Sequence, residues 1–386
     1  MKIAILSESA YPVLNGVSVS TDTLACGLSQ LGHELLLICP QNPNLKEEDE
    51  NSEGQKPYKI KRTPSNSIYK AYPLPYYNKK LIYNILNEFK PNIVHAQIPF
   101  TYGSISKAWC RDSNVPFVTV NHTLYVDYLH YTHIFKSIIK PILIKYLKNF
   151  YNTSDMVITP SIMMKEKLIS YGVTKNIEVI PTGINIPSKE DIDKTMSIKE
   201  QLLISPNDKV IIYLSRIAKE KNIYMLIDAF NMLFKEVSGL KLMICGGGPL
   251  LHDLVSYKDK LECREHIIFT GMIKKENVND YLYCGDIFAF PSYTETQGLA
   301  VLEAMACGLA VVAVNEGGVP EAIHNNIDGV LCKNNATNMK NKLKELLTNE
   351  NLRRNIQEKA KTNAQTQTVE RMIEKYNNLY ISLCQK

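Results

Sequence analysis

The stretch from Phe288 to Val314 combines residue types that suit a bound phosphate. An apolar, strand-like run is followed by a polar turn at residues 292–297, and an amphipathic segment then begins at Gly298. The first residues of a helix have backbone N–H groups without intrahelical partners, and these attract an anion, commonly phosphate. This segment therefore predicts a helix start that binds a phosphate.

Two carboxylates flank that helix start. Glu295 lies in the turn, and Glu303 follows about one and a half helical turns into the segment. Carboxylates accept hydrogen bonds from hydroxyl groups, so a nucleotide sugar would satisfy both the phosphate site and the acids. The alternative is a solvated loop acid and an ordinary helical glutamate, but Glu303 interrupts an otherwise apolar run from Leu299 to Ala306.

A pair of cations lies in another loop that follows a strand. Arg216 and Lys221 come after the apolar run 210–214, where their tips could converge on a diphosphate, arginine as a fork and lysine as a point charge. No D-x-D pair, the usual sequence hint of a metal-bound nucleotide sugar, accompanies them. The pattern therefore favours a phosphate site that needs no metal.

The elements that position these residues alternate between strands and helices. Short apolar runs such as Ile3–Leu6 are followed by helical spacing, and the alternation repeats after a linker at Pro181–Pro187. This predicts an α/β protein with two doubly wound, Rossmann-like domains facing across a cleft. We expect domains at residues 1–185 and 186–365, with a helix near 366–386 packing back on the first.

Gly16 and His122 are the candidate site residues of the first domain. Gly16 ends a loop in which a glycine would let backbone amides approach a ligand, although a plain turn would also explain it. His122 follows the strand-like residues 117–120, at the edge of a parallel sheet where open α/β folds bind ligands. A single histidine is also commonly structural, so both interpretations stay open.

Two basic stretches fit an anionic membrane surface. Between residues 56 and 90, lysines alternate with tyrosines, a pattern found at the depth of lipid headgroups. Residues 133–150 predict an amphipathic helix, although Pro141 argues against a long straight one. The alternatives are a solvated loop and a core helix with a basic solvent face. The helix lysines are Lys136, Lys140, Lys145 and Lys148.

Composition excludes several classes of protein. With 386 residues and 45% hydrophobic content, the chain can bury a core and is not disordered. A net charge of +5 gives no general argument for a nucleic-acid partner. Nine cysteines without a C-x-x-C pair indicate reduced thiols. We also predict no signal peptide and no transmembrane helix, and His130 and His133 lack a third metal ligand.

Four motifs occur together in a recognisable order: Ser215–Asn222, Gly246–Pro249, Glu295 with Glu303, and Gly317–Glu321. In this order they resemble retaining GT-B glycosyltransferases of the large family that includes glycogen, sucrose and phosphatidylinositol-mannose enzymes. The resemblance covers essentially the whole chain, and the motifs are specific as an ensemble although each is weak alone.

A finer resemblance concerns the acceptor. Residues 122–131 and 294–298 are similar to bacterial diacylglycerol glucosyltransferases, which are monotopic and need anionic lipid. The resemblance implies transfer of a hexose, with glucose from UDP-glucose expected, to the free hydroxyl of diacylglycerol. It implies a peripheral enzyme on the cytoplasmic face of the membrane, with anionic lipids as partners. Tyr125, Tyr128 and the lysines of residues 133–150 would contact membrane or acceptor.

The resemblance also implies roles for single residues. Arg216 and Lys221 would hold the donor diphosphate, Glu303 the ribose, and His122 the sugar near its reacting carbon. Gly16 would present amides to the phosphate, although many relatives have two glycines where this chain has Asn15–Gly16. The remaining expected donor contacts are Gly247, Glu295, Thr296, Gln297, Gly298 and Leu299. The expected catalytic set is His122, Arg216, Lys221 and Glu295.

These roles imply a front-face reaction that retains configuration. The departing phosphate oxygen would act as base for the acceptor hydroxyl, and cations would stabilise the diphosphate. We expect no obligate active-site metal, with Mg²⁺ at most stimulatory. The alternatives are a transferase for a phosphatidylinositol-type lipid, polysaccharide or soluble sugar, a nucleotide-sugar epimerase, and a non-catalytic binding module.

Overall fold

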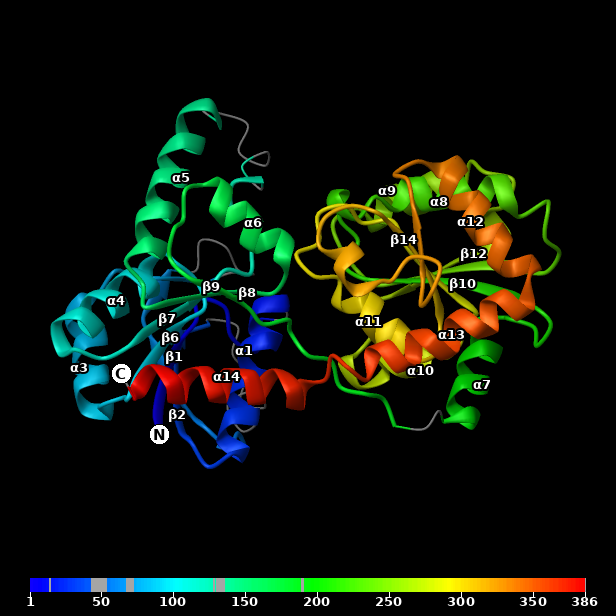
Figure 1. The fold of residues 1–386 in the computed structure, drawn as a ribbon. Helices are drawn as coiled ribbons and strands as arrows, with labels where there is room; N and C mark the ends of the chain where they lie inside the picture. Colours follow the sequence, from blue (N-terminus) through cyan, green and yellow to red (C-terminus); the bar gives the residue numbers. More distant parts are fainter. Residues whose placement is uncertain are drawn as a thin grey trace. The chain divides into compact units, whose positions relative to one another are not determined.

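The structure is a computed structural model that describes residues 1–13, 15–42, 54–66, 73–127, 129, 136–188 and 191–385. The chain divides into two compact units, Met1–Thr182 with Val369–Lys386, and Gly183–Thr368. In each unit a parallel sheet has helices on both faces (Figure 1). The predicted α/β fold with two Rossmann-like domains is therefore confirmed.

The first unit has a seven-stranded sheet in the order β3-β2-β1-β6-β7-β8-β9, with every neighbouring pair parallel. A short hairpin of β4 and β5 lies outside this sheet. The strands are β1 (Lys2–Leu6), β2 (Glu34–Pro40), β3 (Lys59–Thr63), β4 (Ser65–Asn66), β5 (Leu74–Pro75), β6 (Ile93–Ala96), β7 (Phe117–Val120), β8 (Met156–Thr159) and β9 (Ile177–Val179).

Alternate residues of each strand build the two cores of this unit. Ile3 and Ile5 of β1 belong to the cluster beneath α1 and α14, whereas Ala4 and Leu6 belong to the cluster beneath α3, α4 and α5. Strands buried on both faces explain the continuous apolar runs in the sequence. The helices are α1 (Gly16–Gln30), α3 (Lys79–Phe89), α4 (Thr101–Ser113), α5 (Lys136–Asn152), α6 (Ile162–Ser170) and α14 (Val369–Cys384).

The second unit has a six-stranded parallel sheet in the order β12-β11-β10-β13-β14-β15. Its strands are β10 (Lys209–Leu214), β11 (Leu240–Cys245), β12 (Ile267–Gly271), β13 (Ile287–Phe290), β14 (Ala310–Val314) and β15 (Val330–Cys332). Its α-helices are α7 (Ile192–Gln201), α8 (Ile223–Leu233), α9 (Leu251–Lys258), α10 (Val278–Leu282), α11 (Leu299–Ala306), α12 (Ala336–Thr348) and α13 (Glu350–Ala364).

Strand order fixes where each unit is expected to bind its ligand. Chain order runs outward from β1 through β2 to β3, then reverses at β6, and in the second unit it reverses between β10 and β13. Open α/β sheets bind ligands outside the carboxyl ends of the strands on either side of such a reversal. The loops after β1 and β6, and those after β10 and β13, are therefore the segments to examine.

The last helix, α14, belongs to the core of the first unit. Its residues Ile373, Tyr376 and Tyr380 are buried in the same cluster as Leu24 and Leu28 of α1. An added Cβ at Gly27 of α1 would lie 2.4 Å from Cγ1 of Ile373, so these two helices pack closely. The covered face of this sheet therefore depends on a segment far from it in sequence.

The basic stretch at 56–90 is largely built into secondary structure, which corrects the interpretation as a solvated loop, whereas its contact with a membrane stays a prediction. It contains β3 and α3, and Tyr58 is only 7% exposed, with its hydroxyl donating to Asp22 of α1. Lys56 pairs with the same carboxylate at 2.7 Å. Tyr76 and Tyr77 do remain exposed. Residues 67–72 lie outside the described part of the chain.

Candidate active site

An ion pair joins the two loops that flank the reversal of the second sheet. Lys221 follows β10 in the short 3-10 helix η2 (Lys219–Lys221), and its Nζ donates to Oε1 of Glu295, which follows β13. Ser292 Oγ donates to the same oxygen at 2.7 Å and is fully buried. The structure thus brings together two predicted residues that lie 74 positions apart.

Arg216 lies in the same loop as Lys221 and forms an ion pair with a buried carboxylate. Its Nη2 donates to Oε1 of Glu220, whose side chain is 2% exposed, whereas the guanidinium side chain is 58% exposed. A buried carboxylate anchors one nitrogen of the fork, and the rest of the guanidinium faces solvent. Arg216 is therefore positioned to bind an anion with its remaining donors.

The start of α11 has the features of an anion site. Gly298 precedes the helix with φ +85, a left-handed conformation that favours glycine, and no side chain caps the helix. The first N–H groups of a helix lack intrahelical acceptors, so those of Leu299 and Ala300 are available to a ligand. The backbone N–H of Gly318 donates to Glu295 O at 2.7 Å and supports this turn from the next loop.

Glu303, inside α11, lies in an unusual environment for a carboxylate. Burial raises its pKa to about 7, and the positive charge of Lys275 partly opposes this effect. Within the described residues its carboxylate has no hydrogen-bonding or ion-pair partner, so its ionised form is available to accept hydrogen bonds. Such a group suits a hydroxyl-rich ligand, because vicinal hydroxyls would donate to both oxygens.

The turn after β11 contains three consecutive glycines, of which the fold requires two and the third is a candidate contact to the donor. An added Cβ would lie 2.0 Å from Ser215 O at Gly246 and 2.1 Å from Ile217 O at Gly248, so the fold itself requires these glycines. At Gly247 the atom nearest to an added Cβ is 3.4 Å away, on Met272, so a Cβ would fit. Gly247 therefore stays a predicted donor contact that packing does not explain.

In the first unit, Gly16 begins α1 immediately after the loop that follows β1. Asn15 and Ser18 cap the helix reciprocally, and the Asn15 side chain accepts from Ser18 N at 2.9 Å. An added Cβ at Gly16 would meet nothing within 4 Å, so neither packing nor backbone conformation demands a glycine here. An unobstructed helix start at this position is consistent with the predicted phosphate contact.

His122 follows β7, and Gln97 follows the neighbouring strand β6. His122 Nε2 lies 2.7 Å from Oε1 of Gln97, which is 1% exposed. Burial lowers the pKa of His122 to about 4, so the imidazole is neutral at pH 7. His122 can therefore accept or donate one hydrogen bond to a ligand, but it does not supply a positive charge.

Comparison with known proteins identifies the family. The family model for glycosyl transferases group 1 matches residues 195–363, and the model for glycosyltransferase family 4 matches residues 14–187. The alpha-monoglucosyldiacylglycerol synthase of Streptococcus pneumoniae is 32% identical over 321 residues, covering 81% of this chain and 71% of the relative. That of Acholeplasma laidlawii is 30% identical, covering 81% and 80%.

The chain belongs to the group 1 glycosyltransferases. It is therefore an enzyme, a hexosyltransferase, as predicted. Solved structures agree on the fold: Anabaena HepE in complex with UDP superposes with a TM-score of 0.80 at 18% identity, covering 99% of this chain and 100% of that one. A glycosyltransferase from Rickettsia africae also has a TM-score of 0.80, at 24% identity, covering 99% and 98%.

The predicted site residues of this glycosyltransferase fall into a group in each unit. The second unit places Arg216, Lys221, Glu295 and the start of α11 in loops at the carboxyl ends of its strands. In the first unit, Gly16 and His122 follow β1 and β7. Thr296 and Gln297 lie in the turn before Gly298, and Gln297 is 7% exposed.

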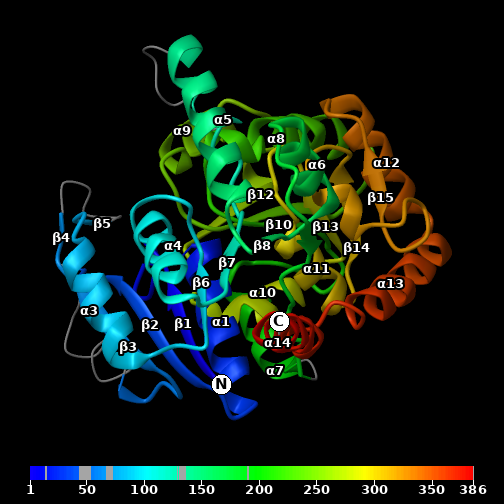
Figure 2. The same cartoon turned by 60° about the vertical axis from the view of Figure 1, so that its left-hand side comes forward.

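Among the expected membrane contacts of the glycosyltransferase, the lysines of α5 are exposed, whereas Tyr125 packs against another side chain. Lys140, Lys145 and Lys148 are exposed on α5, beside Ile138 and Ile142, which are 57% and 64% exposed. α5 continues through Pro141, so the proline does not end the helix. Figure 2 shows α5 extending beyond the other helices of its unit. Tyr125 instead packs edge-on against Phe100, with ring centroids 5.0 Å apart.

Tyr128 lies outside the described residues, as do residues 133–135 at the start of the predicted helix, and only the backbone of Lys136 is described. In the described part of the chain, no helix combines the length and apolarity needed to span a bilayer.

Sequence reasoning missed three residues that hold the site together: Ser292, Glu220 and Gln97. Each is a buried polar side chain that contacts a predicted residue. Glu220 directly precedes Lys221 in the recognised motif, and its spacing from Arg216 was the available signal. Gln97 directly follows β6, and Ser292 lies two residues after β13; the position near a strand end was a weaker signal.

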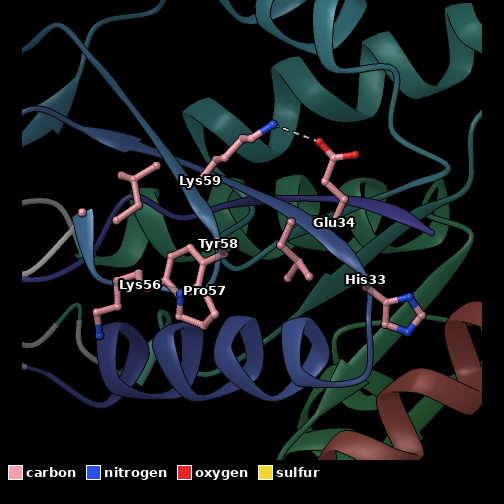
Figure 3. Close-up of a pocket in the computed structure, with 9 residues that line it drawn as sticks. His33, Glu34, Lys56, Pro57, Tyr58 and Lys59 are labelled. Carbon is pink, nitrogen blue, oxygen red and sulfur yellow. Dashed lines mark hydrogen bonds and ion pairs between the residues drawn. The ribbon is translucent and has the colours of Figure 1, made fainter.

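A separate hollow of about 690 Å³ lies on the first unit beside β2 and β3 (Figure 3). It is lined by His33, Glu34, Lys56, Tyr58 and Lys59 among others, and Lys59 Nζ donates to Glu34 at 3.0 Å. Glu34 and Lys59 are the first residues of their strands, so the hollow lies at the amino ends of the sheet. Because α/β folds bind ligands at the opposite edge, we do not assign it to the active site.

Proposed function

We propose that this glycosyltransferase transfers glucose from UDP-glucose to the free hydroxyl of diacylglycerol at an anionic membrane surface, with retention of configuration. The observation that carries the proposal is the identity of 32% and 30%, over 81% of this chain, to two alpha-monoglucosyldiacylglycerol synthases. The activity in their names yields an α-glucoside of diacylglycerol, the product expected when the α configuration of UDP-glucose is retained.

The second unit supports the donor half of the proposal. Arg216 and the start of α11 offer donors for a diphosphate, and Lys221, which pairs with Glu295, adds a positive charge. Glu303 supplies a half-buried acceptor for the ribose hydroxyls. A nucleoside diphosphate sugar thus matches these groups in charge and hydrogen bonding.

The same groups account for the chemistry of the step. As the glycosidic bond to UDP breaks, negative charge grows on the diphosphate, and fixed cations and helix N–H groups stabilise it. The departing phosphate oxygen accepts the proton of the diacylglycerol hydroxyl, which attacks the same face of the sugar. His122, neutral at pH 7, contacts a sugar hydroxyl and takes no part as an acid.

Helix α5 supports the membrane half of the proposal. Exposed Ile138 and Ile142 alternate with exposed Lys140 and Lys145 on its surface. Isoleucines at acyl-chain depth and lysines beside lipid phosphates are the arrangement of a helix that lies in a membrane interface. Because diacylglycerol resides in the bilayer, such a helix would bring the enzyme to its acceptor.

Vesicle flotation tests the membrane half. Replacing Lys140, Lys145 and Lys148 by glutamine should reduce binding to vesicles containing phosphatidylglycerol by about tenfold or more, since each lysine near an anionic surface contributes about 1 kcal/mol. A matched variant removes three exposed lysines of the second unit: Lys260, Lys333 and Lys359. Equal binding by both variants, or glucosylation of a soluble acceptor alone, would reject this half of the proposal.

A further inference from the structure

The side chains of Gln97 and His122 form a contact that secondary structure holds firmly in place. Gln97 immediately follows β6, and its backbone N–H donates to Leu6 O of β1 at 2.9 Å. His122 lies two residues beyond β7, the parallel neighbour of β6. The Gln97 amide is buried and its Oε1 lies 2.7 Å from His122 Nε2. Two rigid strand ends therefore fix the imidazole ring.

This contact decides which ring nitrogen bears the proton. Burial keeps His122 neutral at pH 7, since its pKa is lowered to about 4, and a neutral imidazole has one N–H. An amide oxygen can only accept, so the proton lies on Nε2 and points at Gln97. Nδ1 then has a lone pair, and it makes no hydrogen bond within the described residues.

The neighbouring histidine, His95, does not alter the predicted protonation of His122. His95 of β6 is fully buried, and its Nδ1 lies 2.5 Å from the Tyr380 hydroxyl of α14. Burial and the proximity of His122 lower its pKa to about 3, so it is also neutral. Among the residues that the structure describes, His95 therefore adds no positive charge that competes with the effect of Gln97.

We propose that Gln97 is a positioning residue that holds His122 in the Nε2–H form, with Nδ1 as an acceptor for one hydroxyl of the bound hexose. The inference rests on the proposed function and deepens it, because it gives His122 a specific hydrogen-bonding sense. A hexose with a hydroxyl at that position donates to Nδ1, and the corresponding deoxy sugar leaves the nitrogen unpaired. Gln97 thus contributes to donor selection without touching the sugar.

A double-mutant cycle tests this positioning role. Gln97→Leu removes the acceptor, and kcat/KM for UDP-glucose should fall about tenfold in the otherwise unchanged enzyme, the effect of one misdirected hydrogen bond. In a His122→Ala background the same substitution should change kcat/KM less than about twofold, because the imidazole that Gln97 orients is absent. An equal loss in both backgrounds would overturn the proposal.

Gln97→Glu provides a second, nearly isosteric variant for the case in which Gln97→Leu does not fold. A carboxylate still accepts from Nε2–H, so activity near pH 8 should approach that of the unchanged enzyme. Its negative charge favours the doubly protonated ring, which raises the pKa of His122. Activity should therefore fall as the pH is lowered through the new pKa, because Nδ1 then bears a proton. A pH profile identical to that of the unchanged enzyme would contradict the proposal.

Nitrogen NMR of the ligand-free protein gives a readout that does not depend on the acceptor. With ¹⁵N-labelled histidine, His122, assigned by its loss in His122→Ala, should show a protonated Nε2 and an unprotonated Nδ1 at pH 7. A protonated Nδ1 would overturn the proposal even if diacylglycerol glucosylation is confirmed. If the acceptor assignment fails, the tautomer and a cycle measured by UDP release still decide the role of Gln97.

Discussion

The ammonium group of Lys221 and the carboxylate of Glu295 form an ion pair that ties the loop after β10 to the loop after β13. Both side chains are largely buried, at 14% and 19% exposed. Because strand order reverses between β10 and β13, the pair marks the edge of the sheet where a ligand is expected. A diphosphate binding there must compete with Glu295 for Lys221.

That competition predicts opposite effects of Glu295→Gln on binding and turnover. Without the carboxylate, Lys221 is free to bind phosphate, so affinity for UDP should rise by about fivefold, or about 1 kcal/mol. Turnover of UDP-glucose should fall about 100-fold if Glu295 also holds the transferred sugar. Calorimetry with UDP and steady-state kinetics measure the two effects. Glu316→Gln, on an exposed residue, controls for the loss of charge; unchanged or weaker UDP binding in Glu295→Gln would refute the competition.

The raised pKa of Glu303 predicts that donor affinity depends on pH. Its carboxyl has a pKa of about 7, so it gains a proton as the pH falls below 7 and loses capacity to accept from the ribose. The Kd for UDP should rise about tenfold between pH 8 and pH 6, since one pH unit below the pKa leaves about one tenth of the group ionised. Glu303→Gln should bind weakly at both values. A variant that keeps the same pH dependence would exclude Glu303 as its source.

The ionised carboxylate of Glu303, which favours donor binding, is also predicted to lower the stability of the folded protein. Because burial raises the pKa of Glu303 in the folded protein from 4.5 to about 7, its effect on stability is most favourable below pH 4.5 and is lost as the pH rises through 7. The loss at pH 8 is on the order of 3 kcal/mol. Glu303→Gln should therefore melt at a higher temperature than the unchanged enzyme at pH 8, with a smaller difference at pH 5. A lower Tm at pH 8 would show that the ionised form is stabilised.

Gly16 and Gly248 predict contrasting outcomes for the same substitution. Gly16→Ala meets no atom within 4 Å, so the free energy of unfolding should be unchanged or rise by about 0.5 kcal/mol. The KM for UDP-glucose should rise about tenfold if a phosphate approaches this helix start, because a methyl group would then crowd it. Gly248→Ala has φ +158 and a Cβ 2.1 Å from Ile217 O, and it should destabilise by about 1–3 kcal/mol. A stable Gly16→Ala enzyme with unchanged KM would remove Gly16 from the site.

The fold and much of the candidate site were accessible from sequence because they have local signatures. Strands buried on both faces read as continuous apolar runs, and Gly298 precedes α11 where the helical pattern begins. Contacts between distant segments have no such signature. The alternation of lysines and tyrosines between residues 56 and 90 predicts surface residues, yet Tyr58 and Lys56 both bind Asp22, more than thirty positions earlier. Gln97 was missed for the same reason, since only strand pairing places it against His122.

The most direct test of the proposed function is the structure of the product made from UDP-glucose and diacylglycerol in phosphatidylglycerol vesicles. We predict a monoglucosyl diacylglycerol by mass spectrometry, with the small anomeric proton coupling of an α-glucoside by NMR. A β-glucoside would contradict retention. No glycolipid, together with glucosylation of a water-soluble acceptor by the same preparation, would contradict the central claim.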